Sequence, residues 1–131
     1  MTLDILLQAF ALVFRFDVLA IIMGAAIFGM FVGAMPGLTA TMATALLIPV
    51  TFFMDPVPAL GAIVTATAMA IFAGDIPAAM LRMPGTPASA AYTDESYLMG
   101  KKGLLDLNLG TNLVTSVLGG LIGVAILVLA A

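Results

Sequence analysis

The 131-residue chain is too apolar for a water-soluble domain: 63% of its residues are hydrophobic, 8% are charged and its mean hydropathy is +1.26. Soluble domains are about 45–50% apolar and about 25% charged, and so short a chain has little interior in which to bury the excess. The net charge of −3, with no basic run longer than Lys101-Lys102, excludes a nucleic-acid partner. The composition predicts an integral membrane protein surrounded by the lipid bilayer.

The chain also contains no cysteine and no histidine. Disulfides and thiolate chemistry are therefore excluded, and the commonest general base and metal ligand is missing. We expect no enzyme, no catalytic residue, no metal site and no cofactor. The ten methionines are scattered and fit the role of adaptable apolar filling.

Residues 1–15 lack the basic start of a cleaved signal peptide. At 100° per residue, Asp4, Gln8 and Arg15 fall on one narrow stripe of an otherwise apolar helix. Two interpretations remain open. The segment is either a helix at the membrane surface or along a bundle, or an N-terminal extension of the first span.

An uncharged stretch over residues 18–54 is too long for one crossing, which takes about 20 helical residues. Pro36-Gly37 divides it into a predicted span over 18–35 and a short apolar helix over 39–49. Uncharged windows over 56–74 and 107–131 predict two more spans, and residues 93–106 form the polar loop. Since only helices satisfy such segments in lipid, we predict a single all-α membrane domain over residues 1–131, polytopic, with broken or re-entrant helices.

Two sequence patterns suggest how these helices pack and face the membrane. Glycines spaced one turn apart, at Gly29, Gly33 and Gly37 and again at Gly119 and Gly123, let helix backbones approach closely. The basic residues at positions 15, 101 and 102 all favour the cytoplasmic side. They would share that side if an even number of crossings separates them.

Two similar breaks in apolar helices carry the candidate site. In each, proline and glycine open the helix, and a threonine follows as a cap for a new one, Thr39 or Thr86; Pro87 then suits the first helical position. In transporters, half-helix N-termini of this kind bind anionic substrates; the alternative is a pair of proline kinks. The candidate substrate-binding residues are Pro36, Gly37, Leu38, Thr39, Arg82, Pro84, Gly85, Thr86, Pro87 and Ser89.

Asp75 and Arg82 are ionisable residues bounded by apolar sequence, which makes both functional candidates at membrane depth. Arg82 could grip a carboxylate at two points, and Asp75 is the candidate for ion coupling. Alternatively the two neutralise each other, or both are solvated at the interface. The adjacent carboxylates Asp94 and Glu95 fit a solvated or helix-capping acidic turn better than an acid/base pair.

The chain resembles the N-terminal part of the large permease subunit of the tripartite tricarboxylate transporters, the TctA family. The resemblance follows the family in order and spacing over nearly the whole chain. The stretches that carry it are LLQAF (6–10), GMFVGAMPGL (29–38), ALLIPVTF (45–52), DP (55–56), PGTPASAA (84–91), KKG (101–103) and GGLIG (119–123).

This resemblance implies a multi-pass permease of the cytoplasmic (inner) membrane, driven by an ion gradient with Na⁺ or H⁺ as the coupling ion. It implies a small membrane subunit and a periplasmic solute-binding protein as partners, with a carboxylate as substrate. The family's binding region would fall on Pro36, Gly37 and Leu38 in the first break. In the second it would fall on Pro84, Gly85, Thr86, Pro87 and Ser89.

Two departures from the family pattern bear on the substrate. Arg82 stands where many members have a small polar residue, and residues 94–98 replace a turn of acidic residue, glycine, tyrosine and proline. Both indicate a subgroup whose ligand need not be citrate. The family's permease is also several-fold longer, with two related halves, so this chain corresponds to part of the first half.

Three interpretations follow for the chain as a whole. It is a permease segment that works with the remainder, a small stand-alone membrane scaffold or assembly protein, or an inactive truncated permease. The apolar end at Ala131 favours a fragment or a split subunit over a finished small protein. We expect that these residues alone do not move solute, because a midplane site needs walls from both halves.

Overall fold

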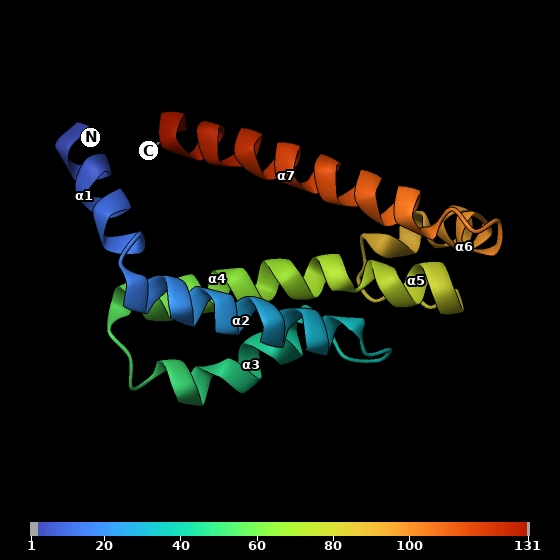
Figure 1. The fold of residues 1–131 in the computed structure, drawn as a ribbon, viewed down its shortest axis with the longest axis horizontal. Coiled ribbons are helices and arrows are strands. Elements are labelled where there is room, and N and C mark those ends of the chain that lie inside the picture. The colour runs from blue at the N-terminus through green and yellow to red at the C-terminus, as the bar shows by residue number, and fades with distance from the viewer. Residues whose placement is uncertain (1–2, 131) are drawn as a thin grey trace.

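The computed structural model describes the backbone of residues 3–130 and the side chains of residues 7–130. In that part of the chain every regular element is a helix, which confirms the predicted all-α class (Figure 1). The elements are α1 (Leu3–Val13), α2 (Phe16–Ala34), α3 (Ala40–Thr51), α4 (Pro56–Ala73), α5 (Asp75–Leu81), the 3₁₀ turn η1 (Ser89–Ala91), α6 (Thr93–Lys101) and α7 (Leu105–Ala130).

Three helical segments are long and apolar enough to cross a membrane: Phe16–Ala34, Pro56–Leu81 and Leu105–Ala130. Each begins within two residues of a predicted span. The second continues past its predicted end, because Gly74 keeps right-handed helical angles (φ −63°, ψ −15°) and α5 follows α4 directly. Pro77 accounts for the interruption, since it has no N–H to offer the carbonyl four residues earlier and its ring crowds that turn.

α1 is a separate helix and not an extension of the first span. A turn at Phe14 and Arg15 divides it from α2, and Figure 1 shows it steeply inclined to α2. α1 makes only sparse contacts with α2 and α4, and the side chains of residues 7–13 are exposed, so the helix leans away from the bundle rather than lying along it. The side chain of Asp4, part of the predicted polar stripe, lies outside the described residues.

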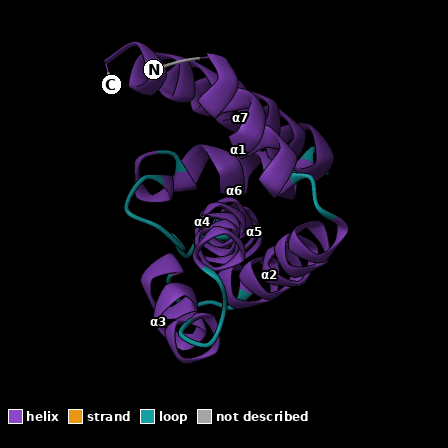
Figure 2. Cartoon of the chain, turned by 90° about the vertical axis from the view of Figure 1, so that its left-hand side faces the viewer, coloured by secondary structure: helices purple, strands orange, loops and turns teal. Residues whose placement is uncertain are grey.

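α4 is the central helix of the bundle. Viewed end-on in Figure 2, α2 and α3 flank it on one side, while α6 and α7 lie on the other. The contact between α2 and α4 is the most extensive in the described chain. α3 turns back beside α4 after the first break, so that three antiparallel segments lie side by side.

Small residues bring α2 and α4 into backbone contact. A Cβ built on Gly29 would lie 2.8 Å from the Cα of Ala66, and one on Gly33 would lie 2.6 Å from the Cα of Ala70. Neither distance is compatible with a side chain. The predicted packing role is therefore confirmed for Gly29 and Gly33, whereas Gly37 has open space around it and a φ of +92° that serves the break instead.

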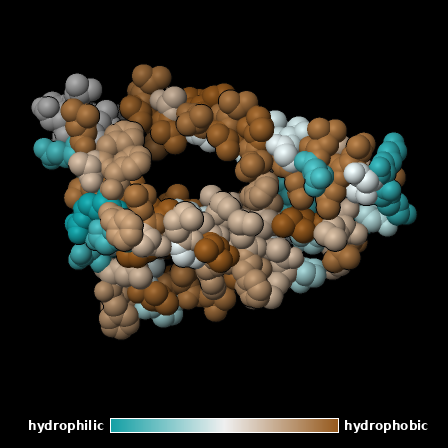
Figure 3. Space-filling view, in the orientation of Figure 1, coloured by the Kyte–Doolittle hydropathy of each residue, from teal (hydrophilic) through white to brown (hydrophobic). Residues whose placement is uncertain are grey.

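α7 leaves the bundle after its first turns. No residue of its apolar window is buried, and a Cβ built on Gly119 or Gly123 would have nothing within 4 Å of it. Figure 3 shows an opening between this strongly apolar helix and the rest of the molecule. The predicted close approach at Gly119 and Gly123 is thus absent within the described residues.

The polar groups gather at the two ends of the long axis (Figure 3), and the basic residues divide between those ends. α2 begins next to Arg15 at one end, whereas α6, which ends at Lys101, lies at the other (Figure 1). The described helices do not give the even number of passes that would let Arg15, Lys101 and Lys102 share one side. The reason is that α3 runs back between α2 and α4, which makes the number of passes between these residues odd.

The predicted polar loop over residues 93–106 is mostly the helix α6. Asp94 and Glu95 lie in its first turn and Lys101 in its last, where these charges complement the helix dipole. The Nζ of Lys101 lies 4.9 Å from the ring centroid of Tyr97. The acidic pair therefore serves the start of a helix, as one of the interpretations of this turn predicted.

Candidate functional site

The first break begins where α2 meets Pro36. Met35 is extended (φ −80°, ψ 122°), as the residue before a proline prefers, and Gly37 turns the chain with its positive φ. The Oγ1 of Thr39 then accepts a hydrogen bond of 3.3 Å from the N–H of Met42 at the start of α3. The predicted threonine cap is confirmed.

The second break differs from the prediction, because no α-helix begins at Pro87. The N–H of Ser89 donates to Thr86 Oγ1 (3.0 Å), as in a cap, but the N–H of Thr86 also donates to Ser89 Oγ (3.0 Å). Ser89 Oγ donates in turn to the carbonyl of Thr86 (2.9 Å). These three bonds tighten the segment into the 3₁₀ turn η1, and the next α-helix starts only at Thr93.

The second break is held against the bend between α4 and α5. A Cβ on Gly85 would lie 2.6 Å from the Cα of Gly74, and a Cβ on Gly74 would lie 3.1 Å from Cγ2 of Thr86. Two glycines thus let an opened segment rest directly on the main chain of the central helix. The contact covers the opened segment on the side of Gly74, and part of the cover that an interrupted helix needs in lipid is thus supplied by α4.

The two breaks line one open pocket of about 560 Å³. α3 enters it at its N-terminus, α4 forms one wall, and the second break forms another. Five of its ten lining residues are threonines, and none carries a charge. The lining residues are Thr39, Ala40, Thr41, Thr44, Thr67, Ile71, Gly85, Thr86, Pro87 and Ala88.

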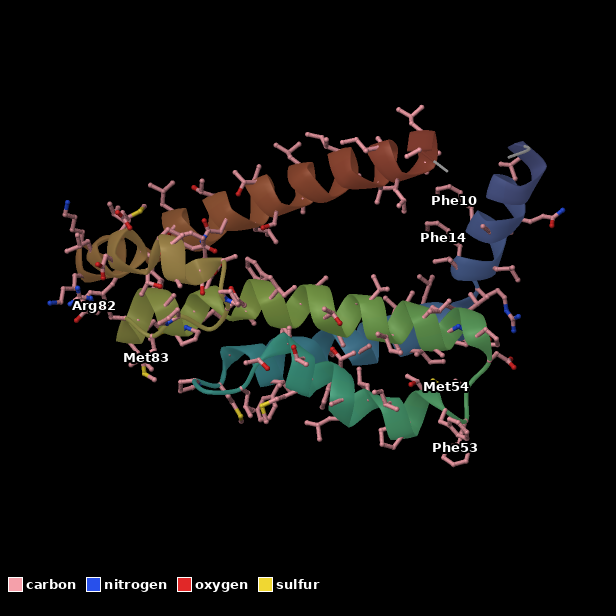
Figure 4. All side chains as sticks on the ribbon, turned by 180° about the vertical axis from the view of Figure 1, so that it is seen from behind. Phe10, Phe14, Phe53, Met54, Arg82 and Met83 are labelled. Carbon is pink, nitrogen blue, oxygen red and sulfur yellow. The ribbon has the colours of Figure 1, made fainter. Side chains whose placement is uncertain are left out.

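Arg82 does not pair with Asp75. Its Nε lies 2.7 Å from Asp94 Oδ1, and both side chains are more than half exposed (62% and 64%). The hydrogen bond and the charge of Arg82 hold the pKa of Asp94 below its usual value. The alternative in which Asp75 and Arg82 neutralise each other is wrong, because Arg82 ends α5 in the left-handed conformation (φ 57°), and Figure 4 shows it at the tip of the molecule.

Asp75 is buried, with 5% of its surface exposed. Tyr92 donates its hydroxyl to Asp75 Oδ1 (2.8 Å), and Asn112 donates from Nδ2 to Asp75 Oδ2 (3.2 Å). Both donors are neutral, and within residues 7–130 no cationic side chain forms a salt bridge with this carboxylate. The three residues tie the bend in the central helix to the segment after the second break and to α7.

The sequence of the chain is similar to those of known membrane transporters. The model of the tripartite tricarboxylate transporter TctA family matches residues 19–131. The chain belongs to the TctA family. It is also 31% identical over 103 residues to an uncharacterised 52.8 kDa protein from the TAR-I ttuC' 3' region of Agrobacterium vitis. The match covers 79% of this chain and 20% of that relative, so the chain spans about a fifth of its length. No solved structure matches.

Membership of this family, together with three membrane-length apolar helices, makes the chain a multi-pass membrane protein of a transporter family. In this TctA chain the pocket unites four of the predicted site residues: Thr39, Gly85, Thr86 and Pro87. The others do not line it. Ser89 is fully buried behind Thr86, Asp75 lies in its own hydrogen-bond network, and Pro36, Gly37, Leu38, Arg82 and Pro84 lie elsewhere in or near the breaks.

Sequence reasoning missed the threonines of the pocket that lie on regular helices. Thr41 and Thr44 lie on α3 and Thr67 lies on α4. Helical threonine at these positions gives no signal in a sequence, because its hydroxyl usually donates to the carbonyl four residues earlier. The spacing of Thr41 and Thr44, within a turn or so of Thr39, was the available signal for a polar stripe on α3.

The titration of Tyr92 tests the contact between this segment and Asp75. Burial, then the hydrogen bond to Asp75 and its charge, raise the pKa of Tyr92 from 10.0 to about 12. In a Tyr97→Phe variant, which leaves Tyr92 as the remaining tyrosine, tyrosinate absorbance in detergent is expected to rise near pH 12. The unfolded chain ionises first, so stability falls between pH 10 and 12. A midpoint near pH 10 in the folded protein would show that the contact is absent.

Proposed function

We propose that this pocket is part of the carboxylate-binding site of a tripartite tricarboxylate transporter permease. The observation that carries the proposal is the meeting of both breaks in one charge-free, threonine-rich pocket. Transporters use opened helices at the membrane midplane for this purpose. We take the substrate class, a carboxylate, from the family. The groups that line the pocket are those that would bind the substrate.

Two hydroxyls are set up as donors to an anion. The oxygens of Thr39 and Thr86 each accept a main-chain N–H, and a hydroxyl in that role keeps its own proton to donate. Ala40 and Thr41 open α3 and line the same pocket. N–H groups in a first turn have no partner inside the helix, and the positive end of the dipole favours a carboxylate there.

Arg82 does not fit this proposal as a direct ligand, since it lies outside the pocket lining and pairs with Asp94. Of the remaining residues expected at the site, Pro36, Gly37, Leu38 and Pro84 shape the breaks, and Ser89 fixes the hydroxyl of Thr86. We place them in the site as supports of the opened backbone and not as contacts to the substrate.

Asp75 supports ion coupling through its environment. The carboxyl group of Asp75 is 5% exposed, accepts hydrogen bonds from two neutral donors and forms no salt bridge within residues 7–130; such groups in transporters mark ion pathways. We propose that Asp75 takes up a proton or cation during the cycle. Uptake by an Asp75→Asn permease is then expected to lose its pH dependence; an unchanged pH profile would leave Asp75 a purely structural anchor.

The complete transporter would comprise this chain, the remainder of the permease, a small membrane subunit and a periplasmic solute-binding protein in the cytoplasmic (inner) membrane. The pocket is open on the side that α3, α4 and the second break do not cover, so we expect its further walls to come from the remainder of the permease. These 131 residues alone are therefore expected to move no solute. Carboxylate uptake by liposomes holding only this chain would contradict that expectation.

Substrate protection of a single cysteine tests the proposed site. The chain contains no cysteine, so Ala88→Cys introduces a unique thiol in the pocket lining, and Ala90→Cys places one two residues away, exposed but outside the lining. In the complete permease, a carboxylate substrate is expected to slow alkylation of the Ala88→Cys variant at least several-fold and to leave the Ala90→Cys variant unaffected. Equal rates with and without substrate at both positions would place the substrate elsewhere.

A further inference from the structure

An opening in the molecule separates α7 from the central helix. The first turns of α7 contact the bundle through Asn108 and Asn112, and beyond them no residue of its apolar window is buried. Figure 3 shows the opening between α7 and the rest of the molecule, and Figure 1 shows α1 at its far end, near the end of α7. In a bilayer this space is filled either by lipid chains or by another helix.

The face of α7 that is turned toward the opening carries small side chains. Asn112 Nδ2 donates to Asp75 Oδ2 (3.2 Å), and this bond fixes which face of α7 is directed at the central helix. At about 100° per residue, Ser116, Gly119 and Gly123 lie on the same face, within about 40° of its centre. A Cβ built on either glycine would have nothing within 4 Å of it, so this small face has no neighbour within the described residues.

The opposite face of α7 consists of large apolar side chains. A helix surrounded by lipid on all sides has no need to separate small from large residues in this way. In membranes, small residues line the contacts between helices because they let two backbones approach closely. The small face therefore predicts a helix as its neighbour, whereas the opposite face suits lipid. The residues of that opposite face are Val114, Val117, Leu121, Val124 and Val128, all exposed.

A polar pocket of about 240 Å³ lies where α7 leaves the bundle, and its lining residues are Tyr92, Asn112, Thr115 and Ser116. One turn earlier on the same face, Asn108 is 6% exposed and its Nδ2 has no hydrogen-bond partner within the described residues. Acyl chains offer no hydrogen-bonding group to such side chains, but a polar residue on a neighbouring helix does. This second observation favours a helix over lipid independently of the glycines.

The far end of the opening is aromatic. The rings of Phe10 and Phe14 on α1 are stacked, with centroids 6.3 Å apart and planes inclined by 16°. Both side chains are more than half exposed, and Figure 4 shows them on the side of α1 that faces the opening. Along the opening, the described residues thus offer a polar pocket, then a small-residue face, then an apolar aromatic pair.

We propose that a transmembrane helix from the remainder of the permease fills this opening. It packs on the small face of α7, places a polar side chain in the pocket beside Tyr92, and directs an apolar end at Phe10 and Phe14. The match to the Agrobacterium vitis relative covers 20% of that protein, so about four fifths of such a permease could supply the helix. A helix of the same polypeptide also has an effective concentration that a separate protein lacks. The proposal does not require the carboxylate site, which stands or falls separately.

Photo-cross-linking in membranes identifies what fills the opening. In the complete permease, Ile126 is replaced by p-benzoyl-phenylalanine; Ile126 is exposed and follows Gly123 on the same face. Val128, exposed on the opposite face, receives the same replacement as the matched control. After irradiation and cleavage at a protease site placed behind Ala131, the Ile126 variant is expected to join this segment to the remainder at least several-fold more efficiently than the Val128 variant, which is expected to give lipid adducts.

Every other product at Ile126 overturns the proposal. A dimer of two copies, a link to the small membrane subunit, lipid adducts or no product would each assign the opening to a different occupant or to none. Equal linking to the remainder from both positions would show that the two faces of α7 do not differ.

Glycine substitutions test the same contact without a bulky probe. Gly119→Leu and Gly123→Leu are expected to lower the unfolding midpoint of the complete permease in detergent by several degrees, because leucine overpacks a close helix contact. Gly110→Leu is the matched control, since Gly110 is on the opposite face of α7 with nothing within 4 Å of its side-chain position. The same midpoint for all three variants would mean that no helix packs on the small face.

Discussion

A Gly33→Leu substitution is expected to destabilise the folded protein by about 3 kcal/mol or more, at the upper end of overpacking effects. The cause is direct contact between two helices: a Cβ at this position would lie 2.6 Å from the Cα of Ala70. Neighbouring atoms here are main chain, so no flexible side chain can move aside. α2 would have to separate from α4, and the first break would lose its position beside the pocket.

Gly24→Leu is the matched control, because Gly24 lies on the same helix with nothing within 4 Å of its side-chain position. Both substitutions exchange glycine for leucine within α2 and improve helix propensity equally. Thermal unfolding in detergent, compared with the parent protein, separates the two cases. Equal midpoints for the two variants would mean that α2 and α4 do not meet at Gly33.

Loss of the Thr86 hydroxyl is expected to have the largest effect on substrate affinity. Thr86 Oγ1 accepts from Ser89 N, which leaves its proton for a carboxylate, and hydrogen bonds to charged groups contribute about 1.5–3 kcal/mol. Thr86→Val should therefore weaken carboxylate binding by about 10- to 100-fold in the complete permease. Equilibrium binding of a radiolabelled carboxylate measures the change.

Two further variants separate this effect from a general disturbance of the second break. Thr86→Ser keeps both the cap to Ser89 and the free proton, so affinity is expected to stay close to that of the parent protein. Arg82→Gln is expected to leave affinity unchanged, because Arg82 is outside the pocket and paired with Asp94. A loss of binding in the Arg82→Gln variant with retention in the Thr86→Val variant would transfer the anion-binding role to Arg82.

Much of the fold could be predicted because the bilayer imposes strong local rules. Uncharged windows indicated the spans, and Pro36-Gly37 with Thr39 indicated the first break and its cap. These local rules do not predict contacts between segments that are distant in the sequence or the competition of side chains for main-chain groups. Gly74 continued the second span into α5 instead of ending it, and Thr86 closed on Ser89 in a 3₁₀ turn because the Ser89 hydroxyl competes for the same main-chain groups.

The candidate site was predictable in its location and less so in its members. The two breaks are visible in the sequence as proline–glycine pairs followed by threonine, and Thr39 and Thr86 do meet in one pocket. The charged residues were misleading, because Arg82 and Asp75 are seven positions apart and their pairing is plausible on one helix. Their actual partners, Asp94 and Tyr92, come from a later segment whose return path only the folded structure reveals.

Cross-linking across the pocket tests most directly whether the two breaks face each other. In the cysteine-free chain, the pair Thr41→Cys and Ala88→Cys joins the start of α3 to the second break, since both positions line the pocket. A short bis-maleimide is expected to link this pair efficiently in membranes, and a carboxylate substrate to slow the reaction. The pair Thr41→Cys and Ala90→Cys is expected to link poorly. Cross-linking in neither pair, or equally in both, would contradict a shared pocket between the two breaks.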